Sequence, residues 1–282
     1  MTTQLTRRFV LTAGASALAL GTLPPLSGDQ WAKASGTKVL MTTGLRATSH
    51  SIAWIGNEAG VFRKHGLDVN FPTLEVGGPE TAAGLMRGDW HFVQTGTVPI
   101  AENVLNGGDA VILLRNIGPN QVGLFVVARA EFTKLDQLAG KRVGVLSDPY
   151  SSQAGTMARL TLEKAGVTAT YVILGTYRNV YKALAAGEID AGTLPIDFRF
   201  LGQSQYGWNY FETAAFGVPP VFATTRGLIA SDRDLVLRTV RGFLETIHLF
   251  KTQPDVVVPL LQRFLNFDDR QAVETCANCM CR

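Results

Sequence analysis

Apolar positions follow two alternating patterns along the chain. Short runs rich in β-branched residues are typical of buried strands, and they lie at 38–43, 67–71, 92–94, 111–114, 141–146 and 170–174. Longer segments with apolar residues every three or four positions predict helices at 52–64, 79–87, 100–105, 153–165 and 179–186. Because strands and helices alternate, we expect an α/β protein in which each sheet is mostly parallel. Two amphipathic segments, 235–251 and 256–264, predict further helices.

One part of this sequence pattern occurs twice along the chain. The stretch LAAGEIDAGTLPID begins at residue 184, and a weaker copy, LMRGDWHFVQTGTVPI, begins 99 residues earlier at residue 85. In each copy a helix is expected to end at a glycine, Gly88 or Gly187, which can adopt the left-handed conformation without a Cβ clash. An acidic residue, a short apolar strand and a turn at 95–99 or 193–196 follow. The repeat therefore predicts two similar lobes.

The predicted turns lie at the carboxyl ends of parallel strands, where α/β sheets bind ligands. For either copy alone, the alternative explanation is that a glycine followed by an acidic residue is simply a common sequence between a helix and a strand. A second pair of strand ends supports the duplication, since 41–44 leads to a polar turn at 49–51 and 145–148 leads to one at 150–153. Helix capping would also explain the Ser and Thr residues in these turns. We expect two lobes that each form one wall of a cleft.

The first 34 residues have the pattern of an export signal. A pair of arginines, Arg7 and Arg8, precedes an apolar run, and Ala32-Lys33-Ala34 fits the small-x-small cleavage rule. The run is short and is interrupted by glycine and proline, which disfavours a membrane anchor. We expect a cleaved signal peptide at 1–34, a mature chain beginning at Ser35, and a periplasmic location. The arginine pair is twin-arginine-like, and general secretion stays open.

Composition predicts a folded globular protein. The chain has 282 residues, of which 46% are hydrophobic and 17% charged, and its mean hydropathy is +0.13. The net charge is only +3, and it falls to +1 when the signal segment is removed. Without a basic run or patch, a nucleic-acid partner is not expected. We expect a monomer.

The three cysteines, Cys276, Cys279 and Cys281, fall in the last seven residues. A Cys-x-x-Cys-x-Cys tail with no further His or Cys to complete four ligands is weak evidence for zinc, so no metal site is expected. A redox role, a frayed terminus and an altered reading frame are the alternatives.

Three segments carry a resemblance to a known family: SIAWIGNEAGVFRKHGLDVNFPTLEVGGPETAAGLMRGDWHFVQTG, then LDQLAGKRVGVL, then ALAAGEIDAGTLP. The chain resembles the substrate-binding proteins of ABC importers for nitrate, sulfonates, taurine and thiamine-pyrimidine precursors, over about residues 38–270. The resemblance implies a two-lobed, type II periplasmic binding protein. Such a protein closes on a small organic anion or a nitrogen heterocycle and delivers it to an ABC permease in the inner membrane.

The resemblance also implies boundaries and site residues. The first lobe would consist of 37–122 plus 228–282 and the second of 127–222, with hinges near 123–127 and 223–227. The positions that match the family's cleft-lining turns are Ser49, His50, Gly77, Gly78, Thr95, Gly96, Thr97, Asn116, Ser151, Ser152, Pro195 and Asp197.

Physical arguments rank some of these positions. Ser151 and Ser152 head a predicted helix, where backbone N–H groups and the helix dipole favour an anion such as a carboxylate or sulfonate. Gly77-Gly78 either allows a ligand to approach the backbone closely or forms a simple turn. Among the four histidines His50 is the candidate for ligand binding. For His91, which stands where the second copy has Asp190, a packed or solvent-facing imidazole is favoured.

Enzyme chemistry is not expected. The chain has no His-Glu-x-x-His, Gly-x-Ser-x-Gly or Gly-x-Gly-x-x-Gly motif and no complete phosphate loop, so no catalytic residue or cofactor is predicted. The alternative within the resemblance is an enzyme like the thiamine-pyrimidine synthases, which share the fold and have a cysteine-rich motif. A periplasmic sensor that presents its ligand to a receptor is a further alternative, because it would use the same ligand-stabilised closure.

Overall fold

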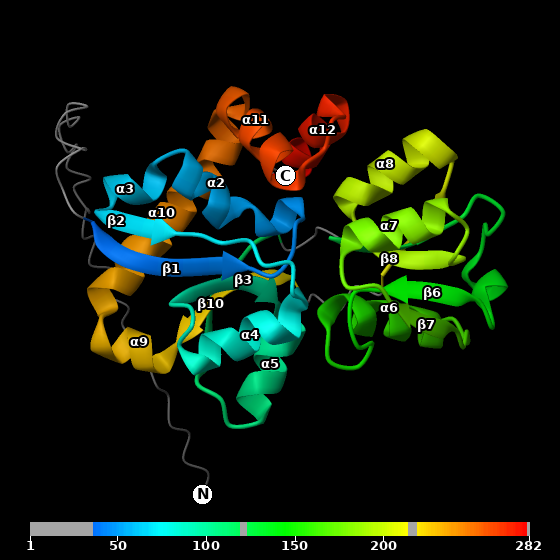
Figure 1. Ribbon diagram of the computed structural model, residues 1–282, viewed down its shortest axis with the longest axis horizontal. Coiled ribbons are helices and arrows are strands. Elements are labelled where there is room, and N and C mark those ends of the chain that lie inside the picture. Colours follow the sequence, from blue (N-terminus) through cyan, green and yellow to red (C-terminus); the bar gives the residue numbers. More distant parts are fainter. Residues whose placement is uncertain (1–35, 119–122, 214–218, 281–282) are drawn as a thin grey trace, which may run out of the picture. The chain divides into compact units, whose positions relative to one another are not determined.

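The computed structural model in Figure 1 describes residues 36–118, 123–213 and 219–280, with side chains up to residue 278. The predicted signal peptide, residues 1–34, lies outside this part of the chain. Within the described ranges every helix is too short or too polar to span a bilayer.

The first sheet has five strands in the order β2-β1-β3-β10-β4. Their bounds are β1 (Thr37–Thr43), β2 (Leu67–Asn70), β3 (Phe92–Gly96), β4 (Ala110–Arg115) and β10 (Pro220–Thr225). β1 pairs in parallel with both β2 and β3, whereas β10 is antiparallel to its neighbours β3 and β4. Four strands therefore run in one direction, and the strand that returns from the second half of the chain runs against them.

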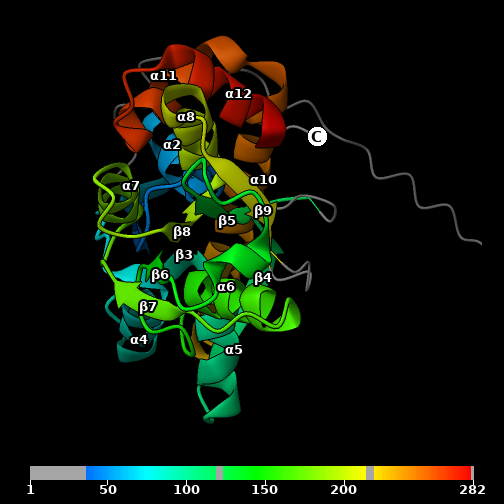
Figure 2. The ribbon, with the colours of Figure 1, turned by 90° about the vertical axis from the view of Figure 1, so that its right-hand side faces the viewer.

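The second sheet repeats this topology, with the order β7-β6-β8-β5-β9. Its strands are β5 (Leu124–Ala128), β6 (Arg142–Val145), β7 (Thr170–Ile173), β8 (Ala191–Pro195) and β9 (Asn209–Glu212). β5 is antiparallel to β8 and β9. Figure 2 shows these three strands from the side of the second lobe. Each sheet thus takes its antiparallel strand from the residues that cross between the halves of the chain.

Helices pack on both sheets, and we call each sheet with its helices a lobe. The first lobe has η1 (Thr48–His50), α2 (Ile52–Glu58), α3 (Val61–Lys64), α4 (Gly77–Arg87), α5 (Thr97–Leu105), α9 (Arg226–Ser231) and α10 (Arg233–Thr252). The second has η2 (Leu135–Leu138), α6 (Gln153–Lys164), α7 (Tyr177–Ala185) and α8 (Ile196–Tyr206). Two more helices follow, α11 (Pro254–Leu265) and α12 (Arg270–Met280). The predicted two-lobed α/β fold is confirmed.

The main differences from the predicted elements occur at glycines. The helix predicted at 52–64 is broken into α2 and α3 at Gly60, whose φ of 74° lies in the left-handed region. The turns predicted at 95–99 and 193–196 are wrong, because β3 and β8 run directly into the helices α5 and α8. Gly96 and Pro195 have extended φ and ψ angles, which place each of them as the residue before the first helical turn.

The sequence repeat corresponds to a structural repeat. β3 and β8 occupy equivalent positions of the two copies, and the glycines before them have φ angles of 82° at Gly88 and 72° at Gly187. In both copies the glycine N–H and the next N–H donate back to the preceding helix, as expected for a left-handed helix end. Gly88 and Gly187 therefore set the same exit direction into the central strand of each sheet.

His91 and Asp190 fill the same structural position in the two lobes. The Leu40 N–H of β1 donates to His91 Nδ1 at 3.0 Å, and the Arg142 N–H of β6 donates to Asp190 Oδ2 at 3.0 Å. The N–H groups of His91 and Asp190 donate in turn to the carbonyls of Leu40 and Arg142. Each side chain thus supplies an acceptor to the neighbouring strand, which explains how a histidine can replace an aspartate here.

The core of the first lobe contains three stacked phenylalanines. Phe222 of β10 lies between Phe92 of β3, with ring centroids 5.5 Å apart, and Phe243 of α10, at 4.4 Å. All three side chains are fully buried. The strand that returns from the second lobe is therefore held in the first sheet by packing as well as by its backbone pairing.

The predicted hinges can be compared with the strands nearest them. Leu124–Ala128 forms β5 inside the second sheet, and Pro220–Thr225 forms β10 inside the first. Parts of the connections, residues 119–122 and 214–218, lie outside the described residues. The lobe boundaries and the hinges at 123–127 and 223–227 therefore stay predictions.

The frayed terminus considered for the cysteine-rich tail is wrong for the described part of it. Residues 270–280 form the helix α12, and Cys276 is fully buried in it. α12 packs against α11 and also against α8 of the second lobe. The tail is part of the folded protein because it fills an apolar position between these helices.

We predict that replacing His91 tests the structural repeat. His91→Leu removes the acceptor of the Leu40 N–H and should lower the free energy of unfolding by about 1 kcal/mol. His91→Asn keeps an acceptor oxygen and should change it by less than about 0.5 kcal/mol. Urea denaturation of the two variants and the wild type measures this difference. Equal losses in both variants would contradict the proposed equivalence with Asp190.

Candidate functional site

The predicted site residues lie at the carboxyl ends of strands or at the starts of the helices that follow. Ser49 and His50 follow β1 in η1, Gly77 and Gly78 open α4, and Asn116 follows β4. Thr95, Gly96 and Thr97 span the junction of β3 with α5. In the second lobe Ser151 and Ser152 precede α6, while Pro195 and Asp197 span the junction of β8 with α8.

Asp197 joins the two lobes. Its carboxylate Oδ2 accepts from the Thr48 N–H at 2.9 Å, and Oδ1 accepts from the Thr48 hydroxyl. Thr48 and Asp197 are fully buried. The Cys276 thiol of α12 also donates to this carboxylate. Burial raises the pKa of Asp197, while the hydrogen bonds from Thr48 and then Cys276 oppose that rise.

His50 lies two residues after Thr48 and is almost completely buried. Its Nδ1 is 3.1 Å from the Ser49 hydroxyl, and its Nε2 has no hydrogen-bond partner among the described residues. Burial lowers the pKa of His50 to about 4. The imidazole is therefore neutral at physiological pH, and Nε2 can donate or accept according to the tautomer.

A second contact between the lobes lies at the start of α5. The Thr97 N–H donates to Oε1 of Gln153, the first residue of α6, at 2.5 Å. The Thr97 hydroxyl donates to the Pro219 carbonyl beside β10 at 2.5 Å. Gly96 allows this approach, because a Cβ at this position would lie 2.7 Å from Gln153 Oε1.

Gly77 and Gly78 lie beside this junction. Gly77 has a φ of 81°, donates to the Gly44 carbonyl at 3.1 Å, and faces the second lobe, since a Cβ added to it would lie 3.7 Å from Ser147 Oγ. The Thr95 hydroxyl donates to the Gly78 carbonyl at 3.4 Å. The two glycines therefore bring backbone close to the end of β3 and to the second lobe.

Asn116 reaches the same end of the first sheet through β10. Its N–H donates to the Pro220 carbonyl at 2.9 Å, and Pro220 is paired with Gly96. The Asn116 side chain is buried, yet neither its amide oxygen nor its amide nitrogen has a partner in the described part of the chain.

The predicted serine pair is split in its roles. The Ser152 hydroxyl caps α6 by accepting from the Gly155 N–H at 3.2 Å, and it donates to the Asp148 carbonyl at 2.8 Å. Ser151 is half-buried, and its N–H donates to Asp148 Oδ1 at 3.1 Å. The Ser152 hydroxyl is thus occupied within its own helix start, and an anion-binding role for the pair stays a prediction.

Several buried polar atoms at the strand ends have no partner among the described residues. Besides His50 Nε2 and the Asn116 amide, they include Ser147 Oγ, Gln94 Nε2 and Thr193 Oγ1. Buried polar groups are almost always hydrogen-bonded in native proteins, so each of these atoms calls for an explanation. They are uncharged groups, and together they offer both donors and acceptors.

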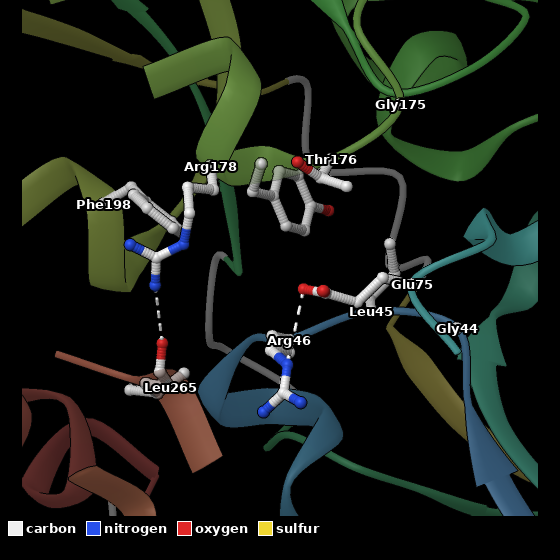
Figure 3. Close-up of a pocket in the computed structure, with 10 residues that line it drawn as sticks. Gly44, Leu45, Arg46, Glu75, Gly175, Thr176, Arg178, Phe198 and Leu265 are labelled. Carbon is white, nitrogen blue, oxygen red and sulfur yellow. Dashed lines mark hydrogen bonds and ion pairs between the residues drawn. The ribbon is translucent and has the colours of Figure 1, made fainter. Parts of the chain in front are cut away.

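A pocket opens between the residues that follow β1 and the start of α7 (Figure 3). Its cavity volume is about 10 Å³, which is room for about one water molecule, and the space around it opens to solvent. Its lining comes from both lobes: Gly44, Leu45, Arg46, Glu75, Gly175, Thr176, Tyr177, Arg178, Phe198 and Leu265. The pocket lining thus adds residues to the predicted set rather than repeating it.

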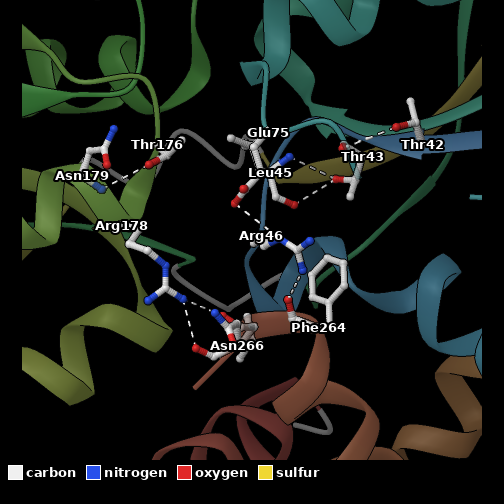
Figure 4. A network of polar contacts seen from close by, with 11 residues as sticks. Thr42, Thr43, Leu45, Arg46, Glu75, Thr176, Arg178, Asn179, Phe264 and Asn266 are labelled. Carbon is white, nitrogen blue, oxygen red and sulfur yellow. Dashed lines mark hydrogen bonds and ion pairs between the residues drawn. The ribbon is translucent and has the colours of Figure 1, made fainter. Parts of the chain in front are cut away.

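The two arginines of this pocket are already engaged (Figure 4). Arg46 of the first lobe donates to the Phe264 carbonyl at 2.6 Å. Arg178 of the second lobe donates to the carbonyls of Leu265 at 3.1 Å and Asn266 at 3.0 Å. Both guanidinium groups therefore lie at the carboxyl end of α11, where the helix dipole favours cations.

Local patterns in the sequence did not reveal Thr48, Gln153, Ser147 or Cys276 as site residues. Their partners are far away along the chain, for example 149 residues between Thr48 and Asp197 and 56 between Thr97 and Gln153. The only features of the sequence that pointed toward Thr48 and Gln153 were the polar turn at 49–51 and the helix start at 153. In the described residues, no three His, Cys, Asp or Glu side chains are grouped so that they could bind a metal ion.

Comparison with known proteins agrees with this architecture. A family model described as ABC transporter, phosphonate, periplasmic substrate-binding protein matches residues 78–200. A protein of Brucella abortus strain 2308 that is named as a binding protein is 27% identical over 230 residues, which cover 77% of this chain and 68% of the relative.

Two solved structures share the fold. The alkanesulfonate-binding protein SsuA from Xanthomonas axonopodis pv. citri, bound to MOPS, has a TM-score of 0.72 and 14% identity, with 87% of this chain and 84% of the other covered. The aliphatic sulphonate binding protein SsuA from Escherichia coli has a TM-score of 0.70 and 14% identity, with 87% and 80% covered.

We predict that His50 makes stability depend on pH. Because the folded pKa of about 4 lies below the ordinary value of 6.5, the unfolded chain binds the proton first, and stability falls as the pH falls from 6.5 to 4. The loss should reach about 3 kcal/mol. Urea denaturation across this range, with His50→Gln as reference, isolates the effect because Asp197 is present in both proteins. Parallel curves would contradict it.

We also predict that Thr48 and Asp197 are energetically coupled. A double-mutant cycle with Thr48→Val and Asp197→Asn should give a coupling energy of at least about 1 kcal/mol, because the hydrogen bonds are buried and one partner is ionisable. The exposed pair Arg270–Glu274 on α12, removed by Arg270→Ala and Glu274→Ala, should give about 0.3–0.5 kcal/mol. Equal coupling in the two cycles would show that Asp197 does not bind the lobes together.

Proposed function

We propose that this chain is a periplasmic substrate-binding protein of the ABC-transporter type that captures a small molecule between its lobes; the family match over residues 78–200 and the shared fold support this proposal. The ligand is a small organic anion, such as a sulfonate or carboxylate, or a nitrogen heterocycle. The closed protein delivers it to an ABC permease in the inner membrane. The proposal includes export by the predicted signal peptide and action as a monomer in the periplasm.

The observation that carries the proposal is a set of buried polar atoms that have no partner among the described residues and that lie on segments following strands of both lobes. His50 Nε2, Ser147 Oγ and the Asn116 amide all belong to residues at strand ends. A hydrogen-bonding ligand held there would satisfy them, and each unsatisfied group otherwise costs stability. The contacts of Asp197 with Thr48 and of Gln153 with Thr97 bring the two walls together around this region.

The enzyme alternative receives less support from the site. A cysteine-rich motif was the feature that suggested a synthase-like enzyme, and the described cysteine of the tail, Cys276, is buried against Asp197 in a structural contact. The family model that matches residues 78–200 describes substrate-binding proteins, and the fold is shared with two of them, which supports a binding role. A sensor that presents the ligand to a receptor would use the same cleft, so genomic neighbours and permease binding separate the two roles.

We predict that the exported form, residues 35–282, binds one ligand per chain without turnover. In a thermal-shift screen of sulfonates, aromatic carboxylates and pyrimidines, at least one compound should raise the melting temperature, because a ligand that binds only the native state stabilises it. Titration calorimetry of that compound should give one-to-one binding, and mass spectrometry should recover it unchanged.

Asn116→Leu should weaken the binding of that compound about fivefold to tenfold, since a ligand hydrogen bond is lost. Its melting temperature should hardly change, because the Asn116 side chain has no partner among the described residues. Asn70→Leu on the exposed face of β2 serves as the control and should change neither quantity. A screen without any stabilising compound would contradict the proposed function.

A further inference from the structure

The side chain of Gln153 occupies the start of a helix in the opposite lobe. Gln153 opens α6 of the second lobe and is 8% exposed. Its Oε1 accepts the N–H of Thr97, the first residue of α5 in the first lobe, at 2.5 Å. The Gln153 oxygen thus already accepts the Thr97 N–H, which is one of the backbone groups that a ligand at the predicted site would use.

The backbone of the first lobe is shaped to receive this side chain. A Cβ on Gly96 would lie 2.7 Å from both Cβ and Oε1 of Gln153, so the contact requires glycine at residue 96. On the other side, the Ser152 cap fixes the first turn of α6 and therefore the position of Gln153. Gln153 is therefore fixed through its backbone in α6 of the second lobe and through its side-chain oxygen to Thr97 of the first lobe.

The start of α5 would otherwise be suited to an anion. The helix has nine residues, its N-cap is Gly96, which has no side chain to accept a hydrogen bond, and its first turn carries no acidic residue. The Thr97 N–H and the positive end of the helix dipole favour an oxyanion at such a position, and Pro99, the third residue of the helix, supplies no N–H there. Gln153 supplies a neutral oxygen there instead.

The positive charges that line the pocket in Figure 3 are also committed to the protein. The guanidinium groups of Arg46 and Arg178 donate to the carbonyls at the end of α11. An anion placed beside Thr97 would have to displace the Gln153 oxygen, and the hydrogen bond between Thr97 and Gln153 would then be lost. A neutral ligand that leaves Gln153 in place avoids this cost.

We propose that Gln153 determines specificity: it occupies the oxyanion position at the start of α5 and makes the site select a neutral nitrogen heterocycle over a sulfonate. This inference rests on the proposed function and chooses between its two ligand classes. The buried groups without partners among the described residues, His50 Nε2, Ser147 Oγ and the Asn116 amide, are uncharged and can donate or accept hydrogen bonds, as the edge of such a ring requires.

Titration calorimetry of the exported chain with cytosine and with the sulfonate MOPS tests the proposal. Wild type should bind cytosine at least tenfold more tightly than MOPS. Gln153→Ala should bind MOPS about tenfold more tightly than wild type does, with cytosine changed by less than threefold. Gln153→Glu, which keeps an acceptor and adds a negative charge, should not bind MOPS. Gln203→Ala on the exposed face of α8 is the matched control and should behave as wild type.

A second measurement follows the contact itself. Hydrogen exchange of the Thr97 amide, measured by NMR without ligand, should be at least tenfold faster in Gln153→Ala than in wild type or Gln203→Ala. Unchanged exchange would overturn the inference. Tight binding of MOPS by wild type would also overturn it while leaving the proposed function standing. Failure of every variant to bind either compound would instead count against the proposed function.

Discussion

A carboxylate buried between two lobes must find hydrogen-bond donors from both sides, and the fold around Asp197 is arranged to provide them. Thr48 supplies a backbone N–H and a hydroxyl from the first lobe, and Cys276 supplies a thiol from α12. Removing any donor would leave charge or lone pairs unsatisfied in an apolar surrounding, which costs more than the hydrogen bond itself is worth. The position of η1 after β1, the start of α8 after β8 and the packing of α12 are therefore linked through one side chain.

The end of α11 provides a second link between the lobes. Its terminal carbonyls accept from Arg46 of the first lobe and Arg178 of the second, and Asn266 ends the helix in the left-handed conformation with a φ of 55°. Cations at the negative end of a helix dipole are favourable, and here each one belongs to a different lobe. The two C-terminal helices thus act at the contact between the lobes, and they contact both sides of the region where the predicted site lies.

Much of the fold could be predicted from the sequence because periodicity and glycine placement are local signals. The alternation of strands and helices, the repeated glycines Gly88 and Gly187 and the family-like segments indicated two lobes of similar topology. Contacts such as Thr48–Asp197 and Thr97–Gln153 could not be predicted, since each joins residues distant in sequence and neither leaves a periodic pattern. The ordered helix around Cys276 was missed for a related reason: a short, cysteine-rich segment has a weak apolar period, and its stability comes from packing on α8 and α11.

A shared fold does not determine which molecule a binding protein takes, because the ligand is recognised by the few atoms at the strand ends. In this chain, several helix starts there already have an acceptor from the protein: Gln94 Oε1 on the Ala53 N–H of α2, Ser152 on α6 and Thr176 on α7. Gln153 does the same for α5, with the difference that it comes from the opposite lobe. A helix start is the part of this fold best suited to an anion. Proteins with the same fold can therefore bind different classes of ligand, depending on which atom occupies that helix start. The sulfonate-binding structures share the fold at 14% identity, so the fold they share leaves the ligand of this chain to be decided by these atoms.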